Sequence, residues 1–397
     1  MPPPPKNKFK LIIPFHRLPL LVQVQAIQTM DPKDWVNLAL TSKRNERVVK
    51  LARIKTEYFR VEFCHDACIQ LPFYKLVLYY DKHYGRTKKT WGMFTREDMK
   101  TWLNQPSNSM IENAVVMYQK IQNIFVIPKE LGISYCTDIE KKKRATIREL
   151  LSNPVMKNWR ELSVYGKKIS SEDLKMIMDR ATLDRHFELK VEEMPSDFKH
   201  ENAFKFASQD YHDSRWVRIE DLYGLKNSIN VTLLRSNFTQ EQIKTFVNYW
   251  VNSEVDMFLW MRIETNDRTH FESLVDGFLG LRCNKTISNN FFMLSTTTSS
   301  SRKDTMLAIS CHRNDLVLTA WAENENYQAI KDLEELNKLF RNLREILTKL
   351  HEKKELEDLW KVGSEEEKID LKVKIEDAIA ELKKLKVVFR NGKAWLI

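Results

Sequence analysis

The apolar residues between positions 15 and 55 recur at the spacing of three short helices. Pro19 opens the first helix, because a proline at the first helical position lacks only an N–H group that would have no partner there. The three helices carry Leu20, Leu21, Val24, Ile27, Trp35, Val36, Leu38, Leu40, Val48, Val49, Leu51 and Ile54. So many large apolar side chains on such short helices predict a module whose core is completed by another chain.

The segment after these helices alternates patterns typical of strands with patterns typical of helices. Aromatic and branched residues are concentrated at 58–63 and at 73–80, which predicts two strands. Helices are expected to begin at Thr95 and to cover 111–121 and 145–151. We therefore expect a connecting region of mixed α and β structure.

The clearest pattern is an internal repeat, in which residues 162–178 align without a gap to residues 231–247. Each copy predicts a strand, a short turn, an apolar residue, a helix N-cap and an amphipathic helix. Ser170 and Thr239 are the N-caps, because their hydroxyl groups can accept hydrogen bonds from N–H groups of the first helical turn. The repeat therefore predicts two copies of one strand–helix unit.

A further strand is expected after each of these helices, at 186–191 and at 257–263. Strand, helix and strand at this spacing give parallel strands that are joined by a right-handed crossover. Several units in series predict a curved sheet with helices outside, similar to a short leucine-rich-repeat solenoid. Such a stack exposes an extended concave face, which serves binding more often than chemistry.

Two long amphipathic helices are predicted near the end of the chain. Apolar residues recur every three or four positions at 333–350 and at 371–385, with Gly363 and Ser364 between them as helix end and helix cap. A connection this short favours an antiparallel helical hairpin over an extended coiled coil. Residues 387–397 are expected to form a strand pair around an Asn-Gly turn.

The composition is that of a folded protein. Of its 397 residues, 43% are hydrophobic and 30% are charged, which excludes a largely disordered chain. No apolar run reaches the ~18 residues that a membrane helix needs, so we expect no membrane contact. The five cysteines are odd in number and scattered, which is typical of reduced thiols in the cytoplasm or the nucleus.

The formal charge of +10 is concentrated at the start of the chain. Residues 1–56 contain eleven basic and three acidic residues, a surplus of +8 (11 − 3). A basic surface of this kind favours contact with nucleic acid or with an acidic protein. A second basic run, at 141–144, is interpreted as a solvated helix start or loop, and a nuclear-localisation or phosphate-binding patch is the alternative.

Patterns that carry catalysis or bind cofactors are not found in the sequence. There is no Gly-rich phosphate loop, no Gly-x-Ser-x-Gly and no His-Glu-x-x-His motif, so we expect neither an enzyme nor a cofactor. Cys64, His65 and Cys68 supply half of a structural zinc site, but no second ligand pair with suitable spacing follows. Buried thiols near a strand end are the simpler interpretation. We therefore predict no catalytic, cofactor-binding or metal-binding residues.

Two further features have both a binding and a structural interpretation. Trp216, Trp250 and Trp260 belong to the residue type that is favoured at binding hot spots. Trp250, however, shares its apolar helix face with Ile243 and is expected in the core. The polar run at 296–302 is expected to be a flexible loop, and phosphorylation there is the alternative.

Two stretches of the sequence resemble one known family, the F-box proteins. Residues 15–44 resemble an F-box through Leu18, Pro19, Ile27, Met30, Asp31, Pro32, Trp35, Leu38, Leu40, Ser42, Lys43 and Arg44. They depart from the F-box pattern at Ala26 and Thr41. Residues 216–250 resemble the F-box-associated domain of nematode (Caenorhabditis-type) F-box proteins, with a departure at Lys244.

The resemblance implies a non-catalytic adaptor of a Skp–cullin–F-box ubiquitin ligase. The F-box would dock on the Skp subunit, which is acidic in that family, and the region behind it would hold a protein substrate. The expected Skp contacts are Leu18, Pro19, Leu21, Val24, Ile27, Met30, Trp35, Leu38, Leu40, Ser42 and Lys43. Five of these are expected to be buried by the Skp subunit rather than inside this chain: Leu18, Pro19, Ile27, Trp35 and Leu38. A nucleic-acid-binding protein is the second interpretation, and a helical scaffold that acts through the C-terminal hairpin is the third.

The predicted organisation is a mixed α/β (α+β) chain. Its segments are a disordered tail at 1–13, an F-box at 14–55, a connecting α+β region at 56–157, an F-box-associated βα repeat domain at 158–325, and the helical hairpin with its closing strand segment at 326–397. We expect the substrate to bind the repeats and the hairpin to cap one open end of their sheet.

Overall fold

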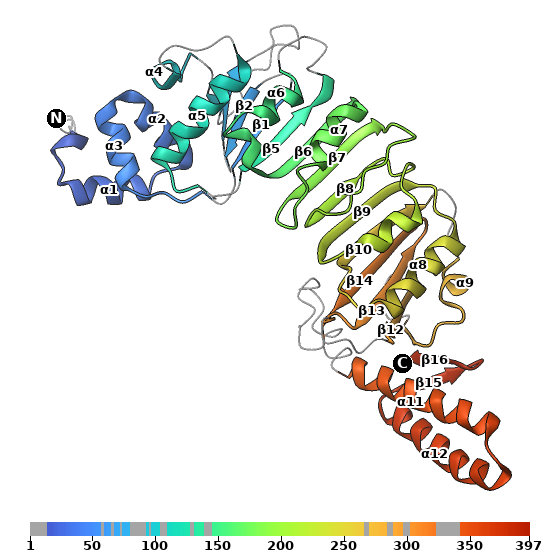
Figure 1. Cartoon of the computed structure of the whole chain (residues 1–397). Helices are drawn as coiled ribbons and strands as arrows, with labels where there is room; N and C mark the ends of the chain where they lie inside the picture. The colour runs from blue at the N-terminus through green and yellow to red at the C-terminus, as the bar shows by residue number, and fades with distance from the viewer. Residues whose placement is uncertain are drawn as a thin grey trace, which may run out of the picture. The chain divides into compact units, whose positions relative to one another are not determined.

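A computed structural model of the chain divides into two compact units, residues 1–165 and residues 166–397 (Figure 1). It describes residues 14–56, 59–64, 67–71, 74–79, 93–94, 97–103, 109–127, 131–138, 145–265, 270–283, 289–296, 302–322 and 342–397. Several expectations lie outside the described residues: the tail at 1–13, His65, the helix start at Thr95, the basic run at 141–144, most of the polar run at 296–302, and the apolar positions between 333 and 341.

Three short helices open the first unit, as the apolar spacing predicts. They are α1 (Leu20–Gln28), α2 (Pro32–Thr41) and α3 (Lys43–Leu51), and they follow the 3-10 turn η1 (Phe15–Arg17). Ser42 caps α3, because its hydroxyl oxygen accepts a hydrogen bond from the Asn45 N–H at 3.1 Å. The buried apolar residues of this module are Ile27, Val36, Ala39, Val48 and Val49.

The first unit continues as a mixed sheet with the strand order β6-β5-β1-β2-β3-β4. β1, β2 and β3 pair antiparallel, whereas β5 pairs parallel with β1 and with β6. α5 packs against β2 and β3 through the buried positions Met110, Ala114, Met117 and Ile121, which lie on one helix face. The strands are β1 (Arg60–Phe63), β2 (Ala67–Leu71), β3 (Tyr74–Tyr79), β4 (Met93–Phe94), β5 (Leu131–Cys136) and β6 (Trp159–Lys168). The helices are α4 (Lys100–Leu103), α5 (Met110–Ile124), α6 (Ile147–Ser152) and the turn η3 (Met156–Asn158).

The second unit has a larger sheet with the strand order β7-β8-β9-β10-β14-β13-β12-β11-β16-β15. β7 to β10 pair parallel, and the pairs from β10 through β14, β13 and β12 to β11 are antiparallel. The strands are β7 (His186–Glu193), β8 (Ser208–Tyr211), β9 (Ser228–Ser236), β10 (Phe258–Thr265), β11 (Leu281–Cys283), β12 (Asn289–Leu294), β13 (Met306–His312), β14 (Asp315–Trp321), β15 (Val387–Arg390) and β16 (Lys393–Leu396). The helices are α7 (Ser171–Met178), η4 (Ile219–Gly224), α8 (Gln240–Asn252) and α9 (Phe271–Val275).

The βα pattern ends at β10, which differs from the expected repeat through 158–325. β13 and β14 are joined by the tight turn at Arg313 and Asn314, in which Arg313 has a φ of 58°. A turn this short permits only antiparallel pairing, whereas parallel strands need a long crossover. Sequence patterns also missed β8, a strand of four residues that is followed by the 3-10 helix η4 rather than by an α-helix.

α8 begins as the sequence predicts. The hydroxyl oxygen of Thr239 accepts a hydrogen bond from the Gln242 N–H at 3.3 Å, and the Gln242 side chain accepts one from the Thr239 N–H at 2.9 Å. Trp250 on this helix is 1% exposed and Trp216 is 7% exposed, so both belong to the core rather than to an exposed binding surface. Trp260 is half-buried.

The strand registers show which side chains of β7–β10 face α7 and α8 and which lie on the other side of the sheet. Tyr211 lies on the helix side, because its hydroxyl group contacts Met178 of α7, and helices α7 and α8 lie on this side of the sheet (Figure 1). The opposite side carries a row of paired residues, one each from β7, β8, β9 and β10: Glu188, Asp210, Thr232 and Arg262. We call this side of β7–β10 the charged face.

Two 20-residue helices, α11 (Leu343–Val362) and α12 (Glu365–Lys384), lie side by side near the end of the chain (Figure 1). The first turns of α11 share a buried cluster with the sheet strands β11, β12 and β13. Ala308 belongs to this cluster and pairs with Thr319, which pairs with Trp260. The helices therefore pack on the side of the sheet that also carries Arg262, rather than capping its open end.

The open edge of the sheet is covered by a strand instead. β16 pairs parallel with β11 and antiparallel with β15. Asn391 and Gly392 join β15 to β16 with φ values of 48° and 74°, as a two-residue hairpin turn requires. Their backbone geometry accounts for the Asn-Gly pair in the sequence.

The cysteines are free thiols in this structure. Cys68 is buried within β2, a strand that the sequence pattern missed, and its thiol donates to a carboxylate oxygen of Glu62 at 3.2 Å. Within the described part of the chain, the structure has no helix that is both long enough and apolar enough to span a membrane.

Candidate functional site

Three consecutive apolar side chains are exposed at the start of α1. Leu20, Leu21 and Val22 are 54%, 68% and 40% exposed. The polar Gln23 is buried instead, and its side-chain amide donates to the carbonyl oxygen of Leu18 at 2.7 Å. A surface helix normally buries its apolar residues and exposes its polar ones. We call Leu20, Leu21 and Val22 the α1 ridge and infer that it is a protein contact surface.

The expected Skp contacts fall into three groups. Pro19, Leu21, Ser42 and Lys43 are exposed, and Leu18, Val24, Met30, Trp35, Leu38 and Leu40 are half-buried. Ile27 is fully buried inside this chain, which corrects the expectation that the Skp subunit buries it. Its carbonyl oxygen accepts a hydrogen bond from the indole N–H of Trp35 at 2.8 Å, so Ile27 and Trp35 help to join α1 to α2.

Leu20 and Val22 are absent from the expected contacts, although the sequence holds a usable signal for them. Leu20, Leu21 and Val22 are consecutive, and successive positions of a helix point about 100° apart. One buried helix face cannot contain all three side chains. An unbroken apolar run on a short helix is therefore evidence that part of it faces another chain.

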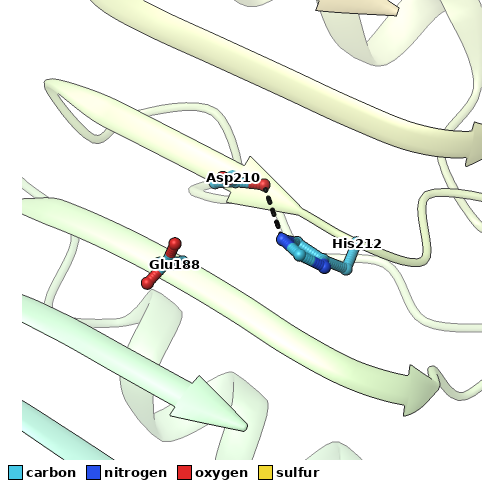
Figure 2. A group of neighbouring side chains, drawn as sticks. All are labelled: Glu188, Asp210 and His212. Atoms are coloured by element: carbon cyan, nitrogen blue, oxygen red, sulfur yellow. Dashed lines mark ion pairs between the residues drawn. The ribbon is translucent and has the colours of Figure 1, made fainter. Parts of the chain in front are cut away.

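The charged face carries a second cluster, in which Glu188, Asp210 and His212 lie together (Figure 2). One carboxylate oxygen of each acid and one imidazole nitrogen lie within 4.8 Å of one another. The register pairs Glu188 with Asp210, and His212 follows the end of β8. The His212 Nε2 atom is 3.6 Å from Asp210 Oδ1.

Protein groups balance much of the charge of this cluster. Burial raises the pKa of Asp210, His212 lowers it, and the negative charge of Glu188 raises it further. Lys190 forms an ion pair with Glu188. Two carboxylates and an imidazole suit a divalent cation. The ammonium group of Lys190, however, already forms an ion pair with the Glu188 carboxylate. The protein itself therefore compensates part of the negative charge of this cluster.

An ion pair extends the charged face beyond this cluster. Arg262 of β10 donates from Nε and Nη2 to the two carboxylate oxygens of Asp315 on β14, both at 3.0 Å. Both side chains remain more than one third exposed, at 38% and 36%. The paired donors and acceptors fix the guanidinium plane and keep part of it available to a ligand.

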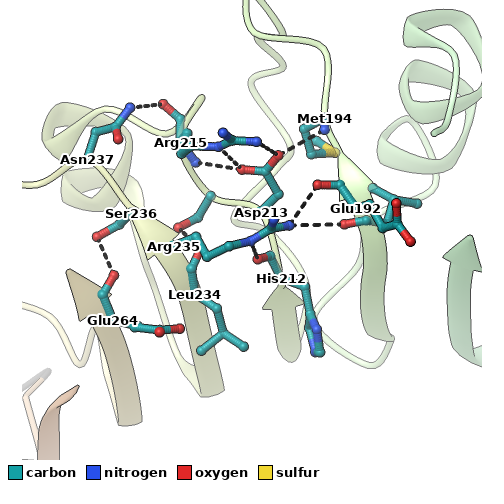
Figure 3. Close-up of polar contacts among 12 residues, drawn as sticks. Glu192, Met194, His212, Asp213, Arg215, Leu234, Arg235, Ser236, Asn237 and Glu264 are labelled. Atoms are coloured by element: carbon teal, nitrogen blue, oxygen red, sulfur yellow. Dashed lines mark hydrogen bonds and ion pairs between the residues drawn. The ribbon is translucent and has the colours of Figure 1, made fainter. Parts of the chain in front are cut away.

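A network of polar contacts joins the carboxyl ends of the parallel strands (Figure 3). Arg235 donates from Nε to the His212 carbonyl oxygen at 2.9 Å and from Nη2 to the Glu192 carbonyl oxygen at 2.8 Å. One guanidinium thus connects the ends of β7, β8 and β9. Ser236 continues the network to β10, because its hydroxyl group donates to the Glu264 carbonyl oxygen at 2.8 Å.

Asp213 is the buried anion of this network. It accepts hydrogen bonds from Arg215 Nε and Nη2, both at 2.7 Å, and from the Met194 N–H at 3.1 Å. Burial alone would raise the pKa of Asp213, but the hydrogen bonds from Arg215 and Met194 hold that pKa below its usual value. The network therefore stabilises the ionised carboxylate.

Replacing Asp213 with Asn is expected to lower the free energy of unfolding by about 2 kcal/mol near neutral pH, the cost of losing charge-assisted hydrogen bonds. Because the folded-state pKa is depressed, this stabilisation is present above the unfolded-state pKa of about 4 and is lost as pH falls through the folded-state value. Urea unfolding at neutral pH and below pH ~3 measures it. A difference between the two proteins that grows on acidification would contradict this reading.

A scan against known protein families matches residues 15–57 to the F-box domain. The match supports the resemblance to an F-box, and it contains α1, α2, α3 and the α1 ridge. Searches of curated proteins and of solved structures found no match to the chain. F-box domains bind the Skp subunit within cullin-RING ubiquitin ligases. The resemblance of residues 216–250 to a nematode F-box-associated domain stays a prediction.

Proposed function

We propose that this chain, which carries an F-box at 15–57, is a substrate adaptor of a Skp–cullin–F-box ubiquitin ligase. The observation that carries the proposal is the α1 ridge. It lies inside the matched F-box and exposes Leu20 and Leu21 by more than half. A partner that covers the ridge removes a large apolar area from water, which is the main driving force of association.

The test is complex formation between the full chain and a purified Skp subunit. We expect the two proteins to elute together in size-exclusion chromatography at equal stoichiometry. Separate elution at micromolar concentrations of both proteins would contradict the adaptor role.

We further propose that a protein substrate binds the charged face in the second unit, within the region that resembles a nematode F-box-associated βα repeat domain. Glu188, Asp210, His212, Arg262 and Asp315 support this proposal, because they are charged or titratable and only half-buried. α11 and α12 cover the same side of the sheet at β11, β12 and β13. Their role would be to complete the core, whereas Glu188, Asp210 and Arg262 on β7, β8 and β10 keep partly exposed side chains for a substrate.

Removing charge from this face is expected to weaken substrate capture. The double variant Asp210→Asn with Arg262→Gln should reduce the recovery of co-purifying proteins about tenfold, since two such contacts at about 0.7 kcal/mol each contribute about 1.4 kcal/mol. Quantitative mass spectrometry of tagged chain bound to Skp measures the recovery. Lys175→Glu, on the exposed surface of α7, is the matched control. Equal recovery from the wild type and the double variant would place the substrate elsewhere.

The proposed role needs no catalytic residue or cofactor in this chain, because ubiquitin transfer takes place on other subunits. We place the protein in the cytoplasm or the nucleus, where free thiols such as those of this chain persist. Two alternatives remain predictions: nucleic-acid binding through the basic N-terminal segment, and a scaffold role of the helical pair. The exposed apolar residues Val362 and Ile369 at the far end of that pair favour the scaffold role.

A further inference from the structure

A groove of about 610 Å³ lies on the first unit between α3 and the end of α5. Arg47, Lys50 and Arg53 line it from α3 and the residues that follow. Leu51 and Val126 contribute large apolar side chains that are 54% and 41% exposed. A volume of this size is within the usual range for ligand pockets, which is about 300–1,000 Å³.

Backbone hydrogen bonds hold the floor of the groove in place. The Val126 N–H donates to the Ile54 carbonyl oxygen at 2.8 Å, and the Thr56 N–H donates to the Val126 carbonyl oxygen at 3.0 Å. An ion pair of 2.7 Å between Lys120 and Glu46 also joins α5 to α3. The groove is therefore formed before a ligand arrives, which lowers the entropic cost of binding.

The groove is strongly positive. Among the described residues that line it, none is acidic, and the nearby carboxylate of Glu46 already pairs with Lys120. Lys50 donates to the neutral side-chain oxygen of Asn123 at 2.6 Å, which leaves its charge uncompensated. The carboxyl end of α3 contributes only about half a negative charge. Three full positive charges, from Arg47, Lys50 and Arg53, outweigh it.

The apolar side chains of the groove indicate whether its ligand is a peptide or a nucleic acid. Single-stranded nucleic acids bind through bases that stack on exposed aromatic rings. Phe125 is the aromatic residue that lines the groove, and it is only 3% exposed. Leu51 and Val126 instead offer aliphatic surface, which suits an aliphatic side chain between acidic residues.

We propose that this groove binds an acidic peptide segment of a partner protein, with an aliphatic side chain of the peptide on Leu51 and Val126 and its carboxylates on Arg47, Lys50 and Arg53. The inference goes beyond the adaptor role, because docking through the α1 ridge does not require a groove on α3. It also gives the basic surplus of residues 1–56 a specific partner class.

A fluorescent peptide with a Leu-Leu pair between runs of glutamate tests the proposal on the full chain. We expect saturable binding by fluorescence anisotropy that weakens with added salt. The double variant Arg47→Glu with Arg53→Glu should weaken binding by at least about tenfold, and Leu51→Ser by about threefold. Arg44→Glu with Lys100→Glu makes the same change of charge at exposed sites outside the groove, and should leave binding unchanged.

Three outcomes would overturn the proposal: failure of the peptide to bind, equal binding of a peptide with Ser-Ser in place of Leu-Leu, or tighter binding of a single-stranded oligonucleotide than of the peptide. Skp binding is measured on the same variants, and we expect it to be unchanged. Parallel loss of peptide and Skp binding would assign the groove to the Skp interface. If the wild type binds the peptide but not the Skp subunit, the adaptor role is overturned and the proposal that the groove binds an acidic peptide is still supported.

Discussion

Replacing Leu20 and Leu21 of the α1 ridge with serine is expected to weaken binding of the Skp subunit by about 20- to 400-fold. Fully burying an exposed leucine side chain contributes about 1.5–3 kcal/mol, and because these two are 54% and 68% exposed, covering them contributes about 2–4 kcal/mol in all. At about 1.4 kcal/mol per tenfold change in affinity, the loss is between about one and two and a half decades. Both side chains are more than half exposed in the chain alone, so the variant should fold normally.

The matched control changes two leucine-like residues that are equally exposed but lie in the second unit. Leu183 and Ile229 are 52% and 50% exposed, and their replacement with serine should leave Skp affinity unchanged. Titration calorimetry with purified Skp measures both variants. If the α1 ridge variant binds Skp with wild-type affinity, the α1 ridge does not support the adaptor role. Equal losses of Skp affinity in both variants would mean that serine in place of any exposed aliphatic residue weakens binding nonspecifically.

The F-box helices show how far an apolar pattern predicts a partner surface. Spacing predicts that α1 is amphipathic, but it does not tell whether a given residue packs on its own chain or on another one. Spacing alone therefore assigns Ile27 to the Skp subunit, whereas the structure buries it fully inside this chain. The α1 ridge depends on tertiary structure, because α2 and α3 leave that part of α1 uncovered.

Capping residues predict helix starts well, because their chemistry is local. Ser170, Thr239 and Ser364 each accept the N–H group three residues later, at the start of α7, α8 and α12. The end of the βα repeat is not predicted in this way. Whether a strand pairs parallel or antiparallel depends on the connection that precedes it, and β14 follows β13 after a turn at Arg313 and Asn314.

The charged face could not be predicted from spacing, because its members come from separate strands. Glu188, Asp210 and Arg262 are brought together by the registers of β7, β8, β9 and β10. One of these strands, β8, was itself missed. A residue on a missed strand has no predicted neighbours, so its pairing with Glu188 and Thr232 is information that only the folded sheet contains.

Replacing Leu347 of α11 with alanine is expected to lower the free energy of unfolding by about 3 kcal/mol, the middle of the usual range for a buried leucine. Leu347 is 1% exposed, and it belongs to the cluster that also contains Phe292 and Ala308 of the sheet. For a unit of this size, each kcal/mol lowers the melting temperature by about 2–4 °C. Circular dichroism should therefore show a melting temperature about 6–12 °C lower.

Leu359 lies farther along the same helix and is 55% exposed, so Leu359→Ala is the matched control and should change stability by less than about 0.5 kcal/mol. Equal destabilisation by both changes would mean that α11 is held by α12 rather than by the sheet.

The Leu347→Ala variant also distinguishes the two roles proposed for the second unit, core completion by α11 and substrate binding by the charged face. If Leu347→Ala lowers stability while the folded fraction still recovers the same co-purifying proteins, then α11 supports the sheet and the charged face binds the substrate. Selective loss of those proteins at a temperature where the variant is folded would instead place the substrate on the helical pair.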